Sequence, residues 1–230
     1  EMTKSCGDGA ISDPATSLTS LQSETFYLGN KGEEIADYSL NYVESSSGSM
    51  VVKSVSISYY AHTGDEPSGV DLNGNGTTGE SGVTLTTRAD ASESTYWLTR
   101  SDTYATSSLG GCRSSNITGS TTGTYNLVSQ TYFTGEKGRE IADYTYGCQQ
   151  LSGDIKTTTI YEYAPSGMAG YVAAGSANPY MRMSRSKTYK DKDGQFSSPS
   201  KLISETYYTG EKGDEISNYT YNYKLKTSDV

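Results

Sequence analysis

The most informative pattern in this chain is a stretch of about twenty residues that occurs three times, with polar and apolar positions in the same order. The copies read SETFYLGNKGEEIADYSLNY from Ser23, SQTYFTGEKGREIADYTYGC from Ser129 and SETYYTGEKGDEISNYTYNY from Ser204. In each copy, polar and apolar residues alternate on both sides of a short segment that begins and ends with glycine. Alternation with a period of two is typical of a half-buried strand, and glycine supplies the positive φ of a short hairpin loop. Each copy therefore predicts a β-hairpin.

The second strand of each predicted hairpin places its aromatic residues on a single face. In the first copy, Tyr38 and Tyr42 share this face with Leu40. The corresponding face carries Tyr144, Tyr146 and Cys148 in the second copy, and Tyr219, Tyr221 and Tyr223 in the third. A general preference of tyrosine for strands would not confine the rings to one face, so we expect them to make cross-strand contacts.

Two further strands are expected after each of the first two hairpins. The third strand reads VVKSVSISYY (51–60) or IKTTTIYEY (155–163), and the fourth reads TYWLTRSDTY (95–104) or YMRMSRSKTY (180–189). Strands that follow one another in sequence are usually neighbours in a sheet. The sequence therefore predicts an all-β fold of tandem antiparallel four-stranded meander repeats, two complete and one partial.

These repeats divide the chain into four parts. We expect an N-terminal arm at 1–22, a first repeat at 23–111 with a Gly-, Thr- and Asp-rich loop insertion at 65–94, a second repeat at 112–200 and a partial third at 201–230.

The partial third repeat suggests how copies of the chain could assemble. A hairpin without its following strands exposes an unpaired edge, which is a template for another strand. The N-terminal arm of a neighbour is the predicted donor, and a head-to-tail contact of this kind makes a filament because it does not close. An alternative of equal weight is that the chain is an excerpt of a longer repeat protein.

Composition supports a thin sheet in preference to a thick core. The chain of 230 residues is only 33% hydrophobic, yet it holds 21 Tyr against 3 Phe and 1 Trp. Tyrosine buries its ring while its hydroxyl stays in contact with water, which suits a sheet with two half-exposed faces.

Charge excludes several classes of partner. The formal net charge is -9, whereas nucleic acids and anionic membrane surfaces select basic proteins. No stretch approaches the roughly 18 apolar residues of a membrane span. We therefore expect no nucleic acid and no membrane insertion.

The three cysteines are related by the repeats. Cys6 and Cys112 lie at the same distance before their hairpins, and Cys148 ends the second hairpin. A Cys112–Cys148 disulfide is the natural prediction, which leaves Cys6 unpaired or bonded to another chain. Disulfides persist in oxidising compartments, so we expect an extracellular or cell-surface location.

The loop DLNGNGTTGE is the best candidate for a metal site. Asp71, Asn73 and Asn75 alternate as in a calcium loop, and Thr77 and Glu80 could complete the oxygen ligands. Position 12 of the pattern is Gly82 in place of glutamate. The alternative interpretation is a glycine-rich surface loop without metal.

Covalent glycans are also predicted. Asn75, Asn116 and Asn218 begin Asn-x-Ser/Thr sequons, and the segment 107–124 is rich in Ser and Thr. Plain solvated loops are the alternative.

No motif indicates catalysis. His62 is the only histidine and is expected in a turn, and no phosphate-binding or dinucleotide-binding motif is present. The acidic residues after each turn, such as Glu34 and Glu140, are expected to be solvated charges that discourage edge pairing. We therefore expect no enzymatic activity.

The segments IYEYAPSGMAGYVAAG (160–175) and ISYYAHTG (57–64) resemble the Tyr-x-Tyr-x-x-x-Gly pattern of the YD/RHS-type repeats of large bacterial surface proteins. The aspartate that follows the second tyrosine in that family is replaced by Ala164 or Ala61. The resemblance to tyrosine-rich repeats covers most of the chain. It implies β-strand arrays at the cell exterior and no catalytic residue.

These patterns together predict a structural subunit of an extracellular bacterial filament or stalk, a homopolymer built head to tail by strand complementation. The alternative is a carbohydrate-binding or adhesive repeat module of a larger surface protein. That module would bind surface glycans with exposed tyrosines and Trp97.

Overall fold

The computed structural model describes residues 22–48, 50–64, 77–89, 96–105, 126–149, 154–165, 170–190 and 201–224. These residues form twelve strands and a short 3-10 helix, Ala174–Ser176, and contain no α-helix. All twelve strands belong to one sheet, and every pairing between them is antiparallel. The predicted all-β antiparallel fold is confirmed. No helix in this part of the chain is long and apolar enough to cross a membrane.

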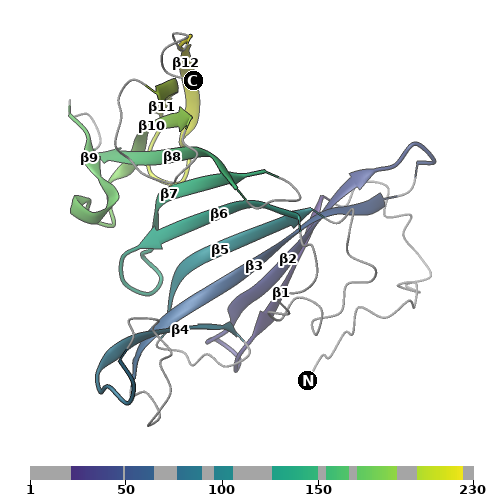
Figure 1. Cartoon of the computed structure of the whole chain (residues 1–230), viewed down its shortest axis with the longest axis vertical. Coiled ribbons are helices and arrows are strands. Elements are labelled where there is room, and N and C mark those ends of the chain that lie inside the picture. The colour runs from purple at the N-terminus through teal and green to yellow at the C-terminus, as the bar shows by residue number, and fades with distance from the viewer. Residues whose placement is uncertain are drawn as a thin grey trace.

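Ten of the strands follow one another across the sheet in sequence order (Figure 1). They are β1 (Ser23–Leu28), β2 (Ile35–Glu44), β3 (Met50–Gly64), β5 (Trp97–Ala105), β6 (Asn126–Thr134), β7 (Ile141–Cys148), β8 (Ile155–Ala164), β10 (Arg182–Lys190), β11 (Leu202–Thr209) and β12 (Ile216–Asn222). The sheet twists strongly, and β1 and β12 lie far apart. Because the strands run through one continuous sheet, the division into two complete repeats and a partial third stays a prediction.

Two short strands lie off this path and were not expected. β4 (Val83–Arg88) pairs with β3, and β9 (Val172–Ala173) pairs with β8. β4 falls inside segment 65–94, so the prediction of a loop throughout that insertion is wrong. β3 is long enough to pair with β2 up to Ile57 and with β4 from Tyr59 onward. A second partner therefore satisfies the part of β3 that extends beyond β2.

The three hairpin turns have the same geometry. Each starts with a glycine whose φ is positive: 119° at Gly29, 118° at Gly135 and 112° at Gly210. A Cβ atom on Gly135 would lie 2.9 Å from the carbonyl oxygen of Arg139, which is closer than real Cβ atoms approach. The same clash would occur at Gly29 with Glu33 and at Gly210 with Asp214. These glycines are therefore required by both the backbone conformation and the lack of space.

Each hairpin also contains an irregularity of pairing at the same place. The register shifts between Phe26 and Tyr27, between Tyr132 and Phe133, and between Tyr207 and Tyr208. A bulge of this kind bends the strand and increases its right-handed twist. The recurring bulges therefore account for part of the twist of the whole sheet.

One face of the sheet, which we call the hydroxyl face, is covered with paired Ser and Thr side chains. Directly opposed residues on neighbouring strands point to the same face, so their hydroxyl groups can meet. Their oxygens lie 2.8 Å apart in Thr25–Ser39 and 2.9 Å apart in Ser56–Thr103, Thr131–Thr145, Thr159–Thr188 and Thr206–Thr220. These pairs satisfy polar groups on a face where the described residues form no second layer.

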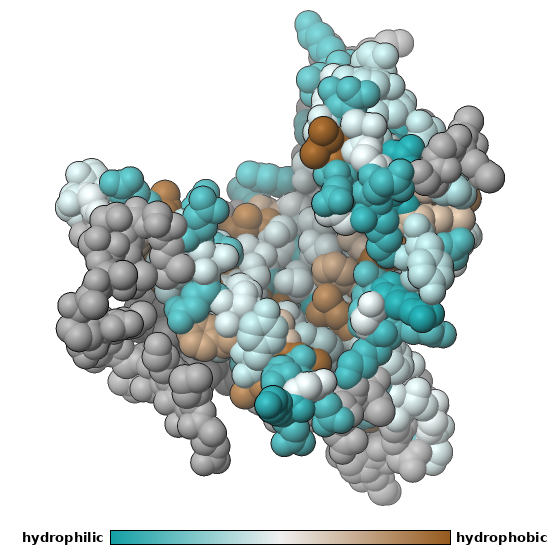
Figure 2. Space-filling model, turned by 180° about the vertical axis from the view of Figure 1, so that it is seen from behind, coloured by the Kyte–Doolittle hydropathy of each residue, from teal (hydrophilic) through white to brown (hydrophobic). Residues whose placement is uncertain are grey.

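The buried residues form small clusters instead of one thick core. The buried side chains of the first cluster are Leu40, Val55 and Ile57, on the face opposite the hydroxyl face. Two further clusters centre on Tyr60 and Tyr163, near the ends of β3 and β8. Seen from behind, apolar residues appear as separate groups among polar ones, around a hollow in the surface (Figure 2). This arrangement agrees with the thin sheet expected from composition.

Tyr60 and Tyr163 fix the ends of two strands to their neighbours. The Tyr60 hydroxyl donates to the carbonyl oxygen of Ala36 over 2.7 Å, and the Tyr163 hydroxyl donates to that of Ala142 over 2.6 Å. Burial raises the pKa of the Tyr163 hydroxyl, so it stays protonated and remains a donor.

We expect Tyr163→Phe to lower the free energy of unfolding by about 1–3 kcal/mol, because the carbonyl of Ala142 loses its buried partner. Tyr180→Phe is the matched control, since Tyr180 is 75% exposed, and it should leave stability unchanged. Urea unfolding followed by circular dichroism measures both. Equal stability of the two variants would contradict the proposed role of the Tyr163 hydroxyl.

We expect Gly135→Ala to cost about 1–3 kcal/mol of stability, because alanine is strained at positive φ and its Cβ would meet Arg139. Gly138 also has a positive φ, of 74°, but has open space around its Cα. Gly138→Asn should therefore cost less, since asparagine tolerates this conformation. Thermal unfolding of the two variants tests the difference.

Candidate assembly interface

The exposed edge of the sheet at β12 is the candidate functional site. β12 pairs with β11 on one side and with no other strand in the described part of the chain. Its counterparts in the other hairpins, β2 and β7, have a strand on both sides. Ile216 is 65% exposed, whereas Ile141, which occupies the same place in β7, is 8% exposed. The sequence of β12 therefore carries apolar positions that its neighbours do not cover.

The tyrosines of β12 keep the arrangement seen in β7. Tyr207 and Tyr219 stack with ring centroids 4.7 Å apart, and Tyr132 and Tyr144 stack at 4.6 Å. The next ring, Tyr221, lies 5.4 Å from Tyr219. Tyr221 is 55% exposed, while Leu40 at the corresponding position of β2 is 4% exposed. Tyr207, Tyr219 and Tyr221 thus contact one another without a further strand, and Tyr221 faces solvent at the position where Leu40 is buried in β2.

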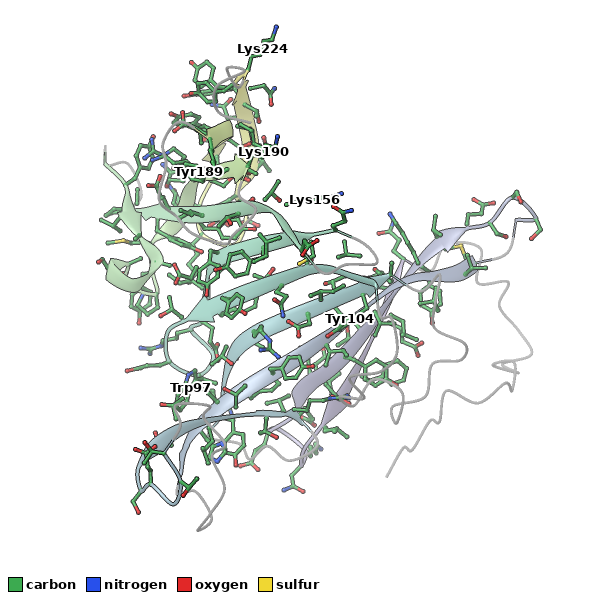
Figure 3. All side chains as sticks on the ribbon, viewed as in Figure 1. Trp97, Tyr104, Lys156, Tyr189, Lys190 and Lys224 are labelled. Atoms are coloured by element: carbon green, nitrogen blue, oxygen red, sulfur yellow. The ribbon has the colours of Figure 1, made fainter. Side chains whose placement is uncertain are left out.

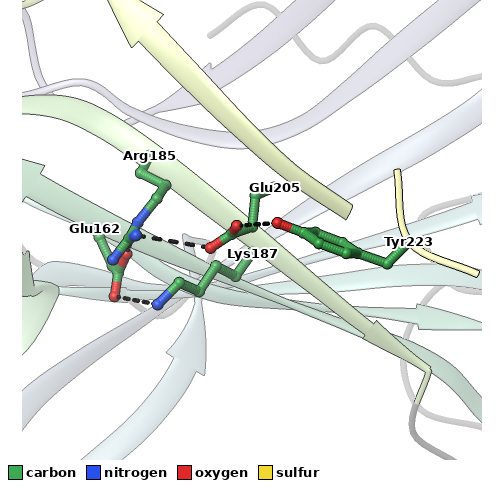
Figure 4. Close-up of polar contacts among 5 residues, drawn as sticks. All are labelled: Glu162, Arg185, Lys187, Glu205 and Tyr223. Carbon is green, nitrogen blue, oxygen red and sulfur yellow. Dashed lines mark hydrogen bonds and ion pairs between the residues drawn. The ribbon is translucent and has the colours of Figure 1, made fainter. Parts of the chain in front are cut away.

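A network of charges holds the strands next to this edge in register (Figure 4). Arg185 on β10 contacts Glu162 on β8 at 2.5 Å and Glu205 on β11 at 3.6 Å. Lys187 contacts Glu162 at 3.3 Å. Opposite charges on neighbouring strands stabilise one register, because a shift would place like charges together. The guanidinium of Arg185 also lies 4.1 Å from the ring centre of Tyr171.

Tyr223, directly after β12, connects the edge to this network. Its hydroxyl donates to Glu205 over 2.6 Å. The hydrogen bond to this carboxylate raises the pKa of Tyr223 to about 12. In the first hairpin, Tyr42 donates in the same way to Glu24 over 3.2 Å. The contact therefore recurs at both ends of the sheet.

The acidic residues after the turns have a role that the sequence did not indicate. Glu140 accepts a hydrogen bond from the backbone N–H of Leu98, and Glu215 accepts one from that of Met183, both over 3.0 Å. Each carboxylate thus joins a hairpin turn to the strand before it. The prediction that Glu140 is a solvated charge is wrong, because it satisfies a main-chain group beside an irregularity in β5.

His62 is also placed differently from the prediction. It lies within β3 and not in a turn, and its ring stacks on Tyr96 with centroids 4.0 Å apart. The C-terminal part of β3 pairs with β4 and includes His62, so this residue lies in a strand and not in the predicted turn.

The predicted calcium site is only partly described. Asp71, Asn73 and Asn75 lie outside the described residues, whereas Thr77 and Glu80 lie just before β4. Among the described residues, no group of three or more His, Cys, Asp or Glu side chains could hold a metal ion. Calcium binding by this loop stays a prediction.

The predicted disulfide and glycan sites are described in part. Cys148 is buried at the end of β7, and burial raises the pKa of its thiol. Its predicted partner Cys112, like Cys6, lies outside the described residues, as do the sequons at Asn75 and Asn116. Asn218 is exposed in β12, at the edge itself.

Trp97 does not share a surface with the exposed tyrosines of β12. It begins β5 and lies at the end of the molecule opposite Lys224, which follows β12 (Figure 3). Trp97 is half-buried. The structure therefore does not bring together the residues that the sequence offered for one sugar-binding groove.

We expect Glu205→Gln to lower the pKa of Tyr223 from about 12 toward 10.0, because the carboxylate that holds its proton is removed. NMR titration of tyrosine labelled at Cζ measures the change, with Tyr223→Phe to assign the signal. Glu211→Gln, in the exposed turn between β11 and β12, is the control and should leave this pKa unchanged. A pKa that is insensitive to Glu205 would show that the hydrogen bond does not form.

No protein-family model, curated protein sequence or solved structure matches this chain, so its function has to be argued from its own geometry.

Proposed function

We propose that this chain is a structural subunit of an extracellular bacterial filament or stalk, and that copies join when β12 of one copy pairs with a strand of the next. The observation that carries the proposal is the exposure of β12 at positions that β2 and β7 bury, with Ile216 against Ile141 as the clearest case.

The main chain of β12 offers free hydrogen-bonding groups to a new strand. The N–H of Tyr223 donates to the carbonyl oxygen of Ile203 in the segment of β11, over 2.8 Å. Successive N–H groups of a strand point to opposite sides in the plane of the sheet. The N–H groups of Thr220 and Asn222 therefore point to the open side, where an added strand can accept them.

The sequence of β12 lacks the features that usually protect an edge. Natural sheets block edge-to-edge pairing with charged residues, proline or inward-pointing charges. β12 reads ISNYTYN and contains neither a charged residue nor a proline. Charged residues flank the strand, Glu215 before it and Lys224 after it, and others lie on β10 and β11, behind the edge. An unprotected edge of this length favours a strand partner over permanent exposure to water.

An external location and a role without catalysis are parts of the same proposal. The hydroxyl face and the half-buried tyrosines suit a thin array with water on both sides. Asn218 is an exposed sequon residue. Residues 1–22 are the donor predicted from the sequence.

A carbohydrate-binding or adhesive module is the second candidate, and one observation favours it. Tyr171 and Tyr180 are exposed, and Arg185 and Arg139 lie over their rings at 4.1 and 5.8 Å. Open aromatic rings beside polar groups can stack on sugars. This function would require binding of soluble glycans by single copies of the chain.

We expect electron microscopy of the purified chain to show filaments, and Thr220→Pro to abolish them. Proline removes the outward N–H of Thr220 and is tolerated on an edge strand. Thr220→Val keeps that N–H and is the matched control, which should still assemble. A chain lacking residues 1–22 tests the predicted donor.

Dispersed monomers of the wild-type chain at all concentrations would overturn the filament proposal. Filaments that persist in Thr220→Pro would place the contact between copies elsewhere on the molecule. Filaments that persist without residues 1–22 would retain the edge contact but exclude this arm as the donor.

A further inference from the structure

We propose that β12 selects its partner strand by sequence and register, and that the partner carries the pattern Ser-x-Ser-Ile-x-x-Tyr found in β3. This inference rests on the proposed function, since it names the strand that the open edge accepts. In β2 and β7 the same hairpin strand already has its partner.

The partners of β2 and β7 share a pattern. The segment 54–60 of β3 reads SVSISYY, and the segment 157–163 of β8 reads TTTIYEY. Both have hydroxyl residues at the first and third positions, isoleucine at the fourth and tyrosine at the seventh. The second, fifth and sixth positions differ, so only part of the strand is common to both pairings.

Both partners pair in the same register. Ile57 lies opposite Tyr38, and Ile160 lies opposite Tyr144. Tyr219 is the corresponding residue of β12, because it stacks on Tyr207 as Tyr144 stacks on Tyr132. The isoleucine of an added strand therefore lies against Tyr219. In their own pairings Ile57 is 1% exposed and Ile160 is partly buried, so this position removes apolar surface from water.

The tyrosine at the seventh position has two partners on the hairpin strand. Tyr60 and Tyr163 donate to the carbonyl oxygens of Ala36 and Ala142. They also belong to the clusters that contain Ile35 and Ile141. The corresponding groups in β12 are the carbonyl of Ser217 and the exposed side chain of Ile216. A tyrosine at this position of an added strand would bond the first and cover the second.

At the first position of the pattern, the residue opposite on the hairpin strand decides whether serine or threonine fits. The Asn41 side chain donates to the hydroxyl of Ser54 over 3.2 Å. The residue of β7 that corresponds to Asn41 is Gly147. A Cβ atom on Gly147 would lie 2.4 Å from the hydroxyl oxygen of Thr157. β12 has Asn222 at this place. The edge therefore matches the serine of β3, and the threonine of β8 would meet the Cβ of Asn222.

The charge of the edge also differs from that of β2. Asp37 of β2 forms an ion pair with Arg88 of β4 at 2.6 Å. The corresponding residue in β12 is the neutral Asn218. A partner of β12 therefore needs no basic residue at this place, and a strand with the pattern of β3 is sufficient without an equivalent of β4.

Residues 1–22 do not carry this pattern. Their only isoleucine is Ile11, which lacks the preceding hydroxyl residues and is followed three positions later by Pro14. The arm contains no tyrosine. β3 itself has strands on both sides in a folded copy, so a donor with this pattern is a strand outside that sheet. Such a strand and the arm are rival donors, and one experiment can separate them.

The test measures binding of a fluorescent peptide of residues 50–64 to the full chain by anisotropy. We expect the peptide to bind the wild-type chain and Thr220→Val, and not Thr220→Pro. Tyr60→Phe in the peptide should weaken binding by about 3–10-fold, the effect of one hydrogen bond. Ser54→Thr should also weaken it. Thr63→Ala is the matched control, because Thr63 is exposed, lies outside the pattern and pairs with β4 instead of β2, and it should bind as the unchanged peptide does.

The outcomes separate the inference from the proposed function. Equal binding of a scrambled peptide, or an equal loss with Thr63→Ala and Tyr60→Phe, would overturn selection by pattern. A peptide of residues 1–22 that binds where 50–64 does not would overturn the inference and support the arm as donor. Failure of every peptide would also overturn the inference, while filament formation by the full chain would still support assembly.

Discussion

The structure depends on main-chain hydrogen bonding between neighbouring strands, because the sheet has little apolar core to hold it together. Its buried side chains form small clusters instead of a continuous layer. Each strand with two neighbours satisfies its N–H and C=O groups on both sides, and each such bond contributes about 0.5–1.5 kcal/mol. A strand with one neighbour leaves half of these groups to water. β1 and β12 each have one neighbour along the main strand order, and β12 is the more open of the two, because all of its residues are exposed.

Tyrosine lets such a thin sheet exist without a second layer. Its ring provides stacking contacts across strands, as in Tyr132–Tyr144 and Tyr207–Tyr219. Its hydroxyl then finds a carbonyl, as Tyr163 does, or a carboxylate, as Tyr223 does. The opposite face relies on paired hydroxyl groups instead of apolar packing. Both faces thus combine contact with neighbours and contact with water.

The same hairpin occurs three times with different neighbours, and this explains how an edge strand can be specific for the sequence of its partner strand. Local contacts within the hairpin are alike in all three, including the glycine turn and the bulge. What differs is the strand that follows. Where it is present, it covers the first isoleucine of the hairpin strand, fully at Ile141 and partly at Ile35, and bonds a carbonyl of that strand. In the described part of the chain no strand lies on the outer side of β12, and there the same groups remain available to a partner.

The sequence by itself determined the strands of the three hairpins, their glycine turns and the faces on which tyrosines lie, since a period of two and the need for positive φ are local properties. Only the tertiary structure decided the existence of β4, the placement of His62 in β3 and the bond from Glu140 to Leu98. These depend on which distant segment lies beside each strand, and alternation along one strand carries no information about its neighbour. For the same reason the pattern could not show that Ile216 is exposed while Ile141 is buried.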